Sequence, residues 1–260
     1  KETFCLFMSY TAPHSFEGPI RDTLDYKEED WPDIEKAHAA KITLLDRQIG
    51  RLINKLKELG ELDNTLILFT SDNGPHFDNG GHELEFFNSN GNLKGGKRDL
   101  YEGGIRVPLI AYWKNKIKSN SKTYHISGFQ DIMSTFAEII GYKTQKGLDG
   151  ISFLPTLISK DQPKHDYLNW EFQLSGWFQN LPSGGFRQSV RFDHWKAVRY
   201  NLNSDIELYD LNEDEGETNN QAHLHPKIVK KAKDIFEISR SEQYGFPYGG
   251  VVQNLSLIHI

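Results

Sequence analysis

The chain has 260 residues, of which 37% are hydrophobic and 25% charged, and its formal net charge is −6. This composition is typical of a globular protein with one large or two smaller domains, and it excludes a nucleic-acid binder that relies on bulk positive charge. No apolar run approaches the roughly 18 residues of a membrane-spanning helix, so we expect no membrane span. The single cysteine, Cys5, excludes an internal disulfide framework.

The first part of the chain predicts an α/β arrangement. The apolar run at residues 3–10 is typical of a strand buried on both faces. Apolar residues at helical spacing predict a helix over 34–59, and a second buried strand follows at 65–70. Because a strand–helix–strand order favours a parallel crossover, we expect a mostly parallel sheet flanked by helices. A further strand is predicted at 107–113 and a further helix over 130–140.

The pattern changes after about residue 160. Short runs there predict antiparallel strands, and Pro226, a favoured first-turn residue, begins a final helix. The runs lie at 167–172, 186–192, 195–200 and 206–209. We therefore predict an α/β domain portion over 1–160 and a small α+β subdomain with an antiparallel sheet over 161–254.

Both ends of the chain carry unusual sequence. The last six residues, LSLIHI at 255–260, resemble the translated end of a transposase-based sequencing adapter, and we interpret them as an artefact. The chain begins at Lys1 with a strand-like run and shows no signal peptide. We therefore expect that its natural N-terminus lies upstream.

The strongest chemical signal is SDNGPH at residues 71–76, directly after the second predicted strand. Ligands of open α/β sheets gather at the carboxyl ends of strands. The side chains of Asp72 and Asn73 offer hard oxygen ligands, which suit Ca²⁺ or Mg²⁺. Asp-Asn-Gly is also common turn chemistry, so this segment alone indicates either a metal site or a turn.

A second signal is the basic, glycine-rich segment LKGGKRDLYEGGIRVP at residues 93–108. Glycines let the backbone approach a ligand closely, and three cations within five residues favour an anionic ligand. The spacing does not match a phosphate-binding P-loop, and a solvated basic loop is the alternative. Glu102 and Arg106 are expected to pair and to shape the loop around Lys97. His14, which follows the first predicted strand, would lie beside the 71–76 segment if the two strands are neighbours.

These segments together resemble the sulfatase family of the alkaline-phosphatase superfamily, of the arylsulfatase and N-acetylgalactosamine-6-sulfatase type. FMSYTAPH at 7–14 is similar to the family's strand that ends in a catalytic-pocket histidine, and FTSDNGP at 69–75 to its second metal-binding segment. GK at 96–97 with YEGGIRVP at 101–108 is similar to its sulfate-lysine segment. The resemblance covers residues 1 to about 240 and implies an incomplete alkaline-phosphatase-like fold.

The resemblance also implies residue roles. Asp72 and Asn73 would be ligands of a divalent cation, usually Ca²⁺ in this family. Lys97 would hold the sulfate oxygens, and His14 would contact the sulfate or the leaving oxygen and assist its protonation. Cleavage of a sulfate ester builds up charge on the non-bridging and leaving oxygens, and a metal, a lysine and a histidine stabilise such charge.

Three further residues are candidates for substrate binding. His76 and His82, in the loop after the metal segment, would line a sugar subsite, with solvated loop histidines as the alternative. Trp177 lies in an open loop and would stack on a carbohydrate ring.

The family's nucleophile is a formylglycine made from Cys or Ser in a Cys/Ser-x-Pro/Ala-x-Arg motif. Cys5 is followed by LFMS, so it does not match, and we expect it to be a buried core thiol. The nucleophile would therefore lie upstream of Lys1. We expect the chain to be the C-terminal part of a periplasmic or secreted sulfatase that acts on sulfated carbohydrate, inactive by itself and with an exposed apolar edge.

Two alternatives remain open. A phosphodiesterase or phosphonate hydrolase of the same superfamily would share the metal scaffold, although the segment around Lys97 favours a sulfatase. A non-catalytic protein that binds sulfated glycans would have lost its nucleophile. The sequence leaves the sugar, the sulfate position and the oligomeric state undetermined.

Overall fold

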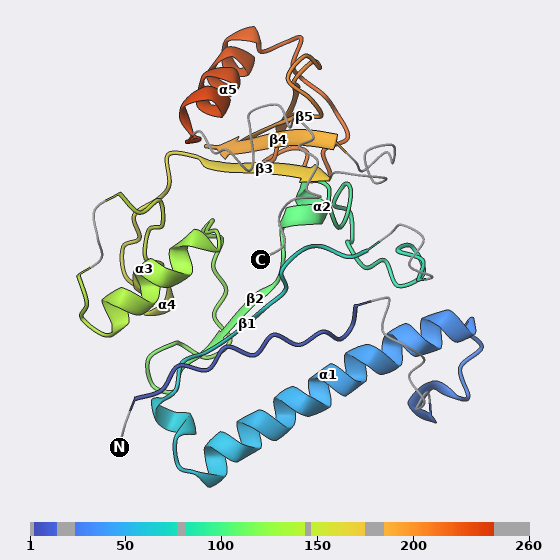
Figure 1. Cartoon of the computed structure of the whole chain (residues 1–260), viewed down its shortest axis with the longest axis vertical. Helices are drawn as coiled ribbons and strands as arrows, with labels where there is room; N and C mark the ends of the chain where they lie inside the picture. Colours follow the sequence, from blue (N-terminus) through green and yellow to red (C-terminus); the bar gives the residue numbers. More distant parts are fainter. Residues whose placement is uncertain (1–2, 15–23, 77–81, 144–146, 175–184, 242–260) are drawn as a thin grey trace, which may run out of the picture.

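The fold was examined in a computed structural model of the chain. The structure describes residues 3–14, 24–76, 82–143, 147–174 and 185–241. Trp177 and the adapter-like residues 255–260 lie outside these ranges. In the described part, the strands form a two-stranded and a four-stranded sheet, with helices beside both, so the mixed α/β class is confirmed (Figure 1).

Helix α1 (Asp33–Glu58) begins and ends within a residue of the predicted bounds. Acidic residues occupy its first turn and lysines its last turn, which complements the helix dipole. Gly60 follows at a positive φ of 68°, a backbone conformation that favours glycine after a helix. The short 3-10 helices η1 (Leu24–Tyr26) and η2 (Leu62–Asn64) flank α1. Its apolar stripe is covered only in part, because Leu56 is 8% exposed and Ile42 is 47% exposed.

Strands β1 (Ile67–Thr70) and β2 (Leu109–Tyr112) lie where strands were predicted, but they pair antiparallel, with Ile67 opposite Tyr112. The expected parallel pairing is therefore wrong for these two strands. The reason lies in the long connection between them. The N–H of Gly74 donates to the carbonyl of Gly104 at 2.9 Å, so the chain returns to the end of β1 that it left. A strand that starts there must run in the opposite direction.

The apolar run at residues 3–10 forms no strand. In Figure 1 this run lies alongside helix α1. Its side chains are largely exposed, with Phe7 at 89% and Phe4 at 55%. Cys5 is exposed as well, so the prediction of a buried thiol is wrong. An apolar run indicates burial only if a covering layer is present, and it becomes a strand only beside a backbone that accepts its hydrogen bonds. Among the described residues no strand pairs with this run.

Helix α3 (Gln130–Ile139), also as predicted, and the single turn of α4 (Leu154–Leu157) follow β2. Asp131 in the first turn of α3 is fully buried. It accepts hydrogen bonds from the backbone N–H groups of Gly128 and Ile151, each at 2.8 Å, and lies 2.9 Å from Nε2 of His165. This carboxylate therefore holds together three segments around the start of α3.

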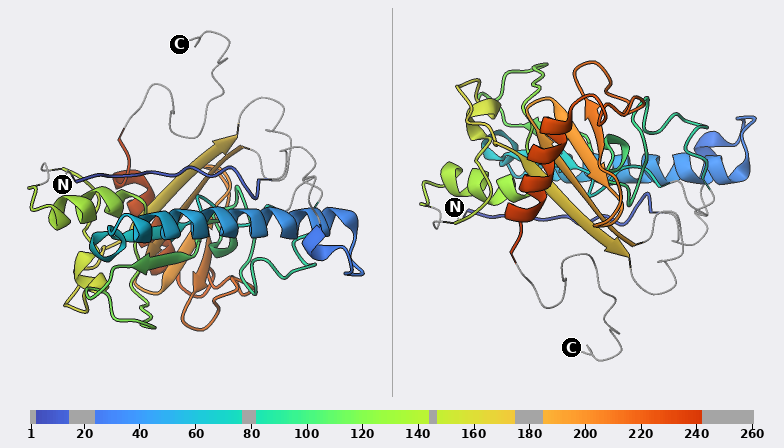
Figure 2. Two further views of the ribbon diagram at one scale, coloured as in Figure 1. Left: turned by 90° about the horizontal axis from the view of Figure 1, so that it is seen from below. Right: turned by 90° about the horizontal axis from the view of Figure 1, so that it is seen from above.

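The four-stranded sheet is antiparallel, as predicted, and its strand order is β3–β4–β5–β6. Its strands are β3 (Leu168–Leu174), β4 (Gly185–Phe192), β5 (Trp195–Arg199) and β6 (Glu207–Asp210). Helix α5 (Pro226–Ile238) crosses one face of this sheet (Figure 2, right). The core of the region lies between them and contains Val190, Phe192, Trp195, Ala197, Leu208, Ala232, Ile235 and Phe236.

The other face of the four-stranded sheet lies toward helix α2 (Glu102–Ile105), on the side away from α5 (Figure 1). Residues that alternate with the core positions point to it, among them Arg187 and Lys196. None of the helices in the described ranges is long and apolar enough to span a bilayer.

Candidate functional site

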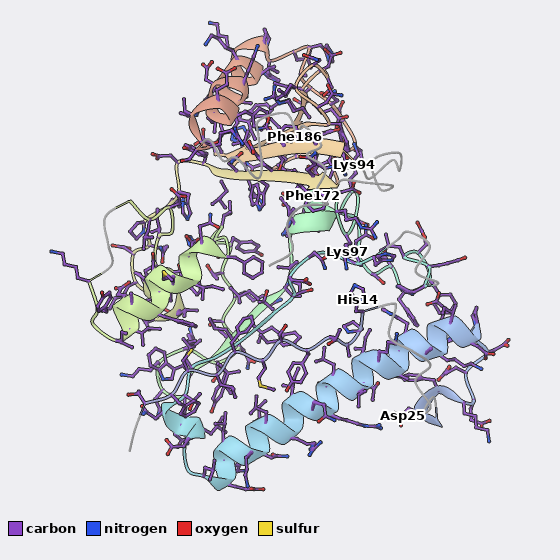
Figure 3. All side chains as sticks on the ribbon, in the orientation of Figure 1. His14, Asp25, Lys94, Lys97, Phe172 and Phe186 are labelled. Carbon is purple, nitrogen blue, oxygen red and sulfur yellow. The ribbon has the colours of Figure 1, made fainter. Side chains whose placement is uncertain are left out.

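His14 and Lys97, which are 83 residues apart in the sequence, lie side by side (Figure 3). The Nζ atom of Lys97 is 3.0 Å from Nε2 of His14. An ammonium group only donates hydrogen bonds, so Nε2 of His14 is the acceptor here and the ring proton belongs on Nδ1. His14 is also held through its backbone, since Nζ of Lys41 in α1 donates to its carbonyl at 3.0 Å. The structure thus brings together the two residues predicted to handle the sulfate.

The segment around Lys97 is joined to the predicted metal segment by backbone hydrogen bonds. The N–H of Lys97 donates to the carbonyl of Pro75 at 2.7 Å, next to the bond between Gly74 and Gly104. A Cβ atom at Gly74 would lie only 1.8 Å from the carbonyl oxygen of Gly103. Only glycine permits this approach, and the two segments are therefore in direct contact at the end of β1.

Asp72 and Asn73 present their side chains beside this contact. Asp72 is exposed, and Nδ2 of Asn73 donates to its Oδ1 at 3.0 Å. This bond orients both side chains and leaves Oδ2 of Asp72 and Oδ1 of Asn73 as hard oxygen donors, which fit Ca²⁺ or Mg²⁺. Ca²⁺ takes about six to eight oxygen ligands, so these residues would supply part of its shell. Over the described ranges, no group of three or more His, Cys, Asp or Glu comes together as a metal site.

His76 lies at the edge of the same site. Its Nε2 is 2.9 Å from Nη2 of Arg98, the residue after Lys97, and the side chain is partly buried. The imidazole accepts from the guanidinium, because arginine has no acceptor. The structure therefore places this predicted substrate residue, partly buried, beside the segment that contains Lys97.

His82 has a different environment. Its side chain is 10% exposed, and its Nδ1 is 2.6 Å from Oε2 of Glu35 in α1. Its ring stacks on His38 with centroids 3.7 Å apart. Burial, together with the nearby His82, lowers the pKa of His38 to about 4. These contacts join α1 to the loop, so His82 holds the loop in place and is not a solvated loop histidine.

The ion pair expected between Glu102 and Arg106 is not formed. Arg106 instead contacts Glu215, while Glu102 is 1% exposed and receives Nζ of Lys196 and Nη1 of Arg191, each at 2.9 Å. Burial alone would raise the pKa of Glu102, but the two cations outweigh it and hold the pKa below its ordinary value. Sequence reasoning missed these partners, although the alternation of β4 and β5 places both cations on one face.

Known proteins are similar to this chain in sequence and in fold. The family model described as Sulfatase matches residues 1–142, more than half of the chain. The chain belongs to the sulfatase family. A second model, described as N-sulphoglucosamine sulphohydrolase, C-terminal, matches residues 95–240 of this sulfatase chain. The second match spans both the Lys97 segment and the four-stranded sheet.

Individual relatives agree with the family assignment. The sulfatase chain is 31% identical over 210 residues to an N-acetylgalactosamine-6-O-sulfatase of Bacteroides thetaiotaomicron, with 75% of this chain and 40% of the relative covered. A protein solved with its substrate D-glucosamine-2-N,6-O-disulfate matches with a TM-score of 0.62 and 25% identity, covering 80% of this chain and 40% of that one.

The crystal structure of Ps i-CgsB matches with a TM-score of 0.75 at 24% identity, covering 92% of this chain and 51% of that one, which shows a shared fold. The chain therefore shares the fold of solved sulfatase structures, as the resemblance implied. The chain spans less than half the length of the first curated relatives that it matches.

Proposed function

We propose that this chain forms part of a sulfuric ester hydrolase that acts on sulfated carbohydrate. The observation that carries the proposal is the contact between Lys97 and His14, beside the segment of Asp72 and Asn73. An ammonium group, an imidazole and two oxygen ligands at one strand end form a set suited to a tetrahedral oxyanion. Relatives of the chain include sulfatases whose names specify sulfated amino sugars.

In the proposed reaction, Lys97 donates hydrogen bonds to non-bridging oxygens of the sulfate and neutralises charge that builds up on them. Asp72 and Asn73 would hold a divalent cation, expected to be Ca²⁺, which supplies further charge stabilisation when bound. His14, whose ring lies beside Nζ of Lys97, would contact the leaving sugar oxygen and assist its protonation.

The nucleophile is assigned to a formylglycine on a segment upstream of Lys1, because the residues after Cys5 lack the required motif. By analogy with the sulfatase relatives, the whole protein would be periplasmic or secreted. His76 and Arg98, at the edge of the site, would face the sugar.

Binding to the purified chain tests the site directly. We expect inorganic sulfate and a 6-O-sulfated amino sugar, each added with Ca²⁺, to shift the NMR signals of the His14 ring. Lys97→Ala should weaken this binding by about tenfold or more, because a charge-assisted hydrogen bond contributes about 1.5–3 kcal/mol. Lys118→Ala, at an exposed lysine after β2, is the matched control. Equal binding by both variants would refute the role of Lys97.

The same titration separates the alternatives. A sulfatase site should bind the singly charged sulfate ester of a sugar in preference to a singly charged phosphodiester of the same sugar, whereas a phosphodiesterase or phosphonate hydrolase should show the reverse order. The 260-residue chain is expected to release no product from an aryl sulfate. Measurable hydrolysis by the purified chain would contradict the upstream placement of the nucleophile.

A further inference from the structure

The face of the four-stranded sheet that lies away from α5 carries buried cations. Strands β4 and β5 alternate, so Arg187 and Lys196 point away from the core, and both are 0% exposed. An antiparallel sheet with one face on a core commonly turns its other face to water. Here another segment of the chain packs on that face, and the charged side chains of Arg187 and Lys196 are buried beneath it. Such burial is costly unless each charge is paired.

The cover is the segment that contains Lys97. Nζ of Lys196 donates to Oε1 of Glu102 at 2.9 Å, at the start of α2. Oε2 of Glu217 accepts the backbone N–H of the same Glu102 at 2.6 Å, and Nζ of Lys196 lies 3.8 Å from Oε1 of Glu217. These contacts form the first ion-pair anchor between the sheet and the segment.

A second ion-pair anchor lies closer to Lys97. Nη1 of Arg187 is 3.1 Å from Oδ1 of Asp99 and 3.1 Å from the carbonyl oxygen of Arg98. The other carboxylate oxygen of Asp99 accepts the N–H of Gly96 at 3.2 Å. The residues immediately before and after Lys97 are thus both held by groups that Arg187 orients.

The first anchor also reaches the metal segment. Helix α2, which Lys196 and Glu217 hold at Glu102, includes Gly104. The carbonyl of Gly104 accepts the N–H of Gly74, next to Asn73. The two anchors therefore act on both parts of the site: one on the backbone around Lys97, the other on the support beneath Asp72 and Asn73.

We propose that Lys196 and Arg187 are positioning residues that hold Lys97 and the metal segment in register through the pairs Lys196–Glu102 and Arg187–Asp99. Apolar packing could attach the segment to the sheet with equal strength, because buried ion pairs add little net stability. Ion pairs differ in that they fix distance and direction at named atoms. The role in sulfate binding rests on the function proposed above, whereas the positioning of Lys97 against His14 does not.

The test uses the full 260-residue chain and two readouts: the affinity for inorganic sulfate and the NMR chemical shift of Nε2 of His14 without sulfate. The second readout reports the Lys97 contact alone. Lys196→Met should shift the His14 signal toward its position in Lys97→Ala and weaken sulfate binding by about tenfold. Lys196→Arg should restore both. Lys230→Met, at a 75%-exposed lysine paired with Asp234 on α5, is the matched control and should change neither.

Hydrogen exchange of the β3–β6 amides shows whether the sheet of each variant is folded. A folded Lys196→Met chain with an unchanged His14 signal and unchanged sulfate affinity would overturn the proposal. If Lys196→Met does not fold, the double variant Lys196→Met with Glu102→Gln is judged by the same criteria. It removes both charges of the pair and keeps a side-chain oxygen that can accept from Nη1 of Arg191. If the unmodified chain binds no sulfate, the proposed function fails, while a His14 shift in Lys196→Met still supports the positioning role.

Discussion

The four-stranded sheet and the α/β region before it differ in how far their apolar residues are covered. Val190, Ala197 and Leu208 of the sheet are 0% exposed. In the earlier region, Ile110 of β2 is 61% exposed and Ile140 after α3 is 73% exposed. Both regions have the sequence patterns of buried elements. A pattern of apolar residues therefore indicates which side chains an element can bury, while the presence of a neighbouring layer determines whether they are buried.

The sharpest test of this difference removes the same side chain in both regions. Phe236 on α5 is 0% exposed and Phe7 is 89% exposed. Phe236→Ala should lower the free energy of unfolding by about 3–5 kcal/mol, because it deletes a fully buried ring. Phe7→Ala should change it by no more than about 0.5 kcal/mol. Urea unfolding followed by circular dichroism measures both effects. A large effect of Phe7→Ala would show that the side chain of Phe7 is covered in the folded protein.

The next largest expected effect is a change of the free energy of unfolding with pH, caused by Glu217 on the charged face of the sheet. Burial raises the pKa of Glu217 to about 7 from an ordinary value of 4.5. Between these pH values the folded state binds more protons than the unfolded state, so stability falls as the pH rises from 4.5 to 7. The loss amounts to roughly 3 kcal/mol at most, at about 1.36 kcal/mol per pKa unit.

Glu217→Gln should remove this dependence, because an amide oxygen can still accept the N–H of Glu102 but does not titrate. We expect the unfolding free energy of the variant, relative to the unmodified chain, to increase between pH 5 and pH 8 in denaturant titrations. Parallel pH profiles of the two proteins would show that Glu217 does not titrate in this way.

A smaller effect of opposite sign is expected in the α/β region. Burial, with the neighbouring His82 as a second cause, lowers the pKa of His38 from 6.5 to about 4. The unfolded state then binds more protons below pH 6.5, so this contribution to stability is lost as the pH falls toward 4. His38→Phe keeps a ring stacked on His82 but cannot titrate. Between pH 7 and pH 5, the free energy of unfolding of the variant should fall by about 2 kcal/mol less than that of the unmodified chain, as measured by urea unfolding.

The elements that sequence reasoning located well are those whose pattern is local. Helices α1 and α5 follow apolar spacing, and the turn at Asp193-His194 joins β4 and β5 as their alternating runs predict. The position of Asp72 and Asn73 directly after β1 likewise came from a motif of a few residues. Local signals suffice for these features because backbone periodicity and turn chemistry determine them.

Features that depend on distant contacts were not predictable in the same way. The antiparallel return of β2 depends on Gly74 meeting Gly104, and the partner of Glu102 lies 94 residues away in β5. Arg106 was predicted to pair with Glu102 because it lies only four positions away in the sequence, but it contacts Glu215 instead. The missing strand at residues 3–10 has the same origin, since the pattern contains no information about whether a neighbour is present.

The contact at Gly74 restricts how this gene can vary. Every amino-acid substitution of a glycine adds a Cβ atom, and here that atom would lie 1.8 Å from a carbonyl oxygen of the segment that carries Lys97. Even alanine would push the two halves of the candidate site apart, so no conservative substitution exists at this position. Among natural variants and random libraries, Gly74 should be one of the least variable positions, whereas Phe7 should vary widely.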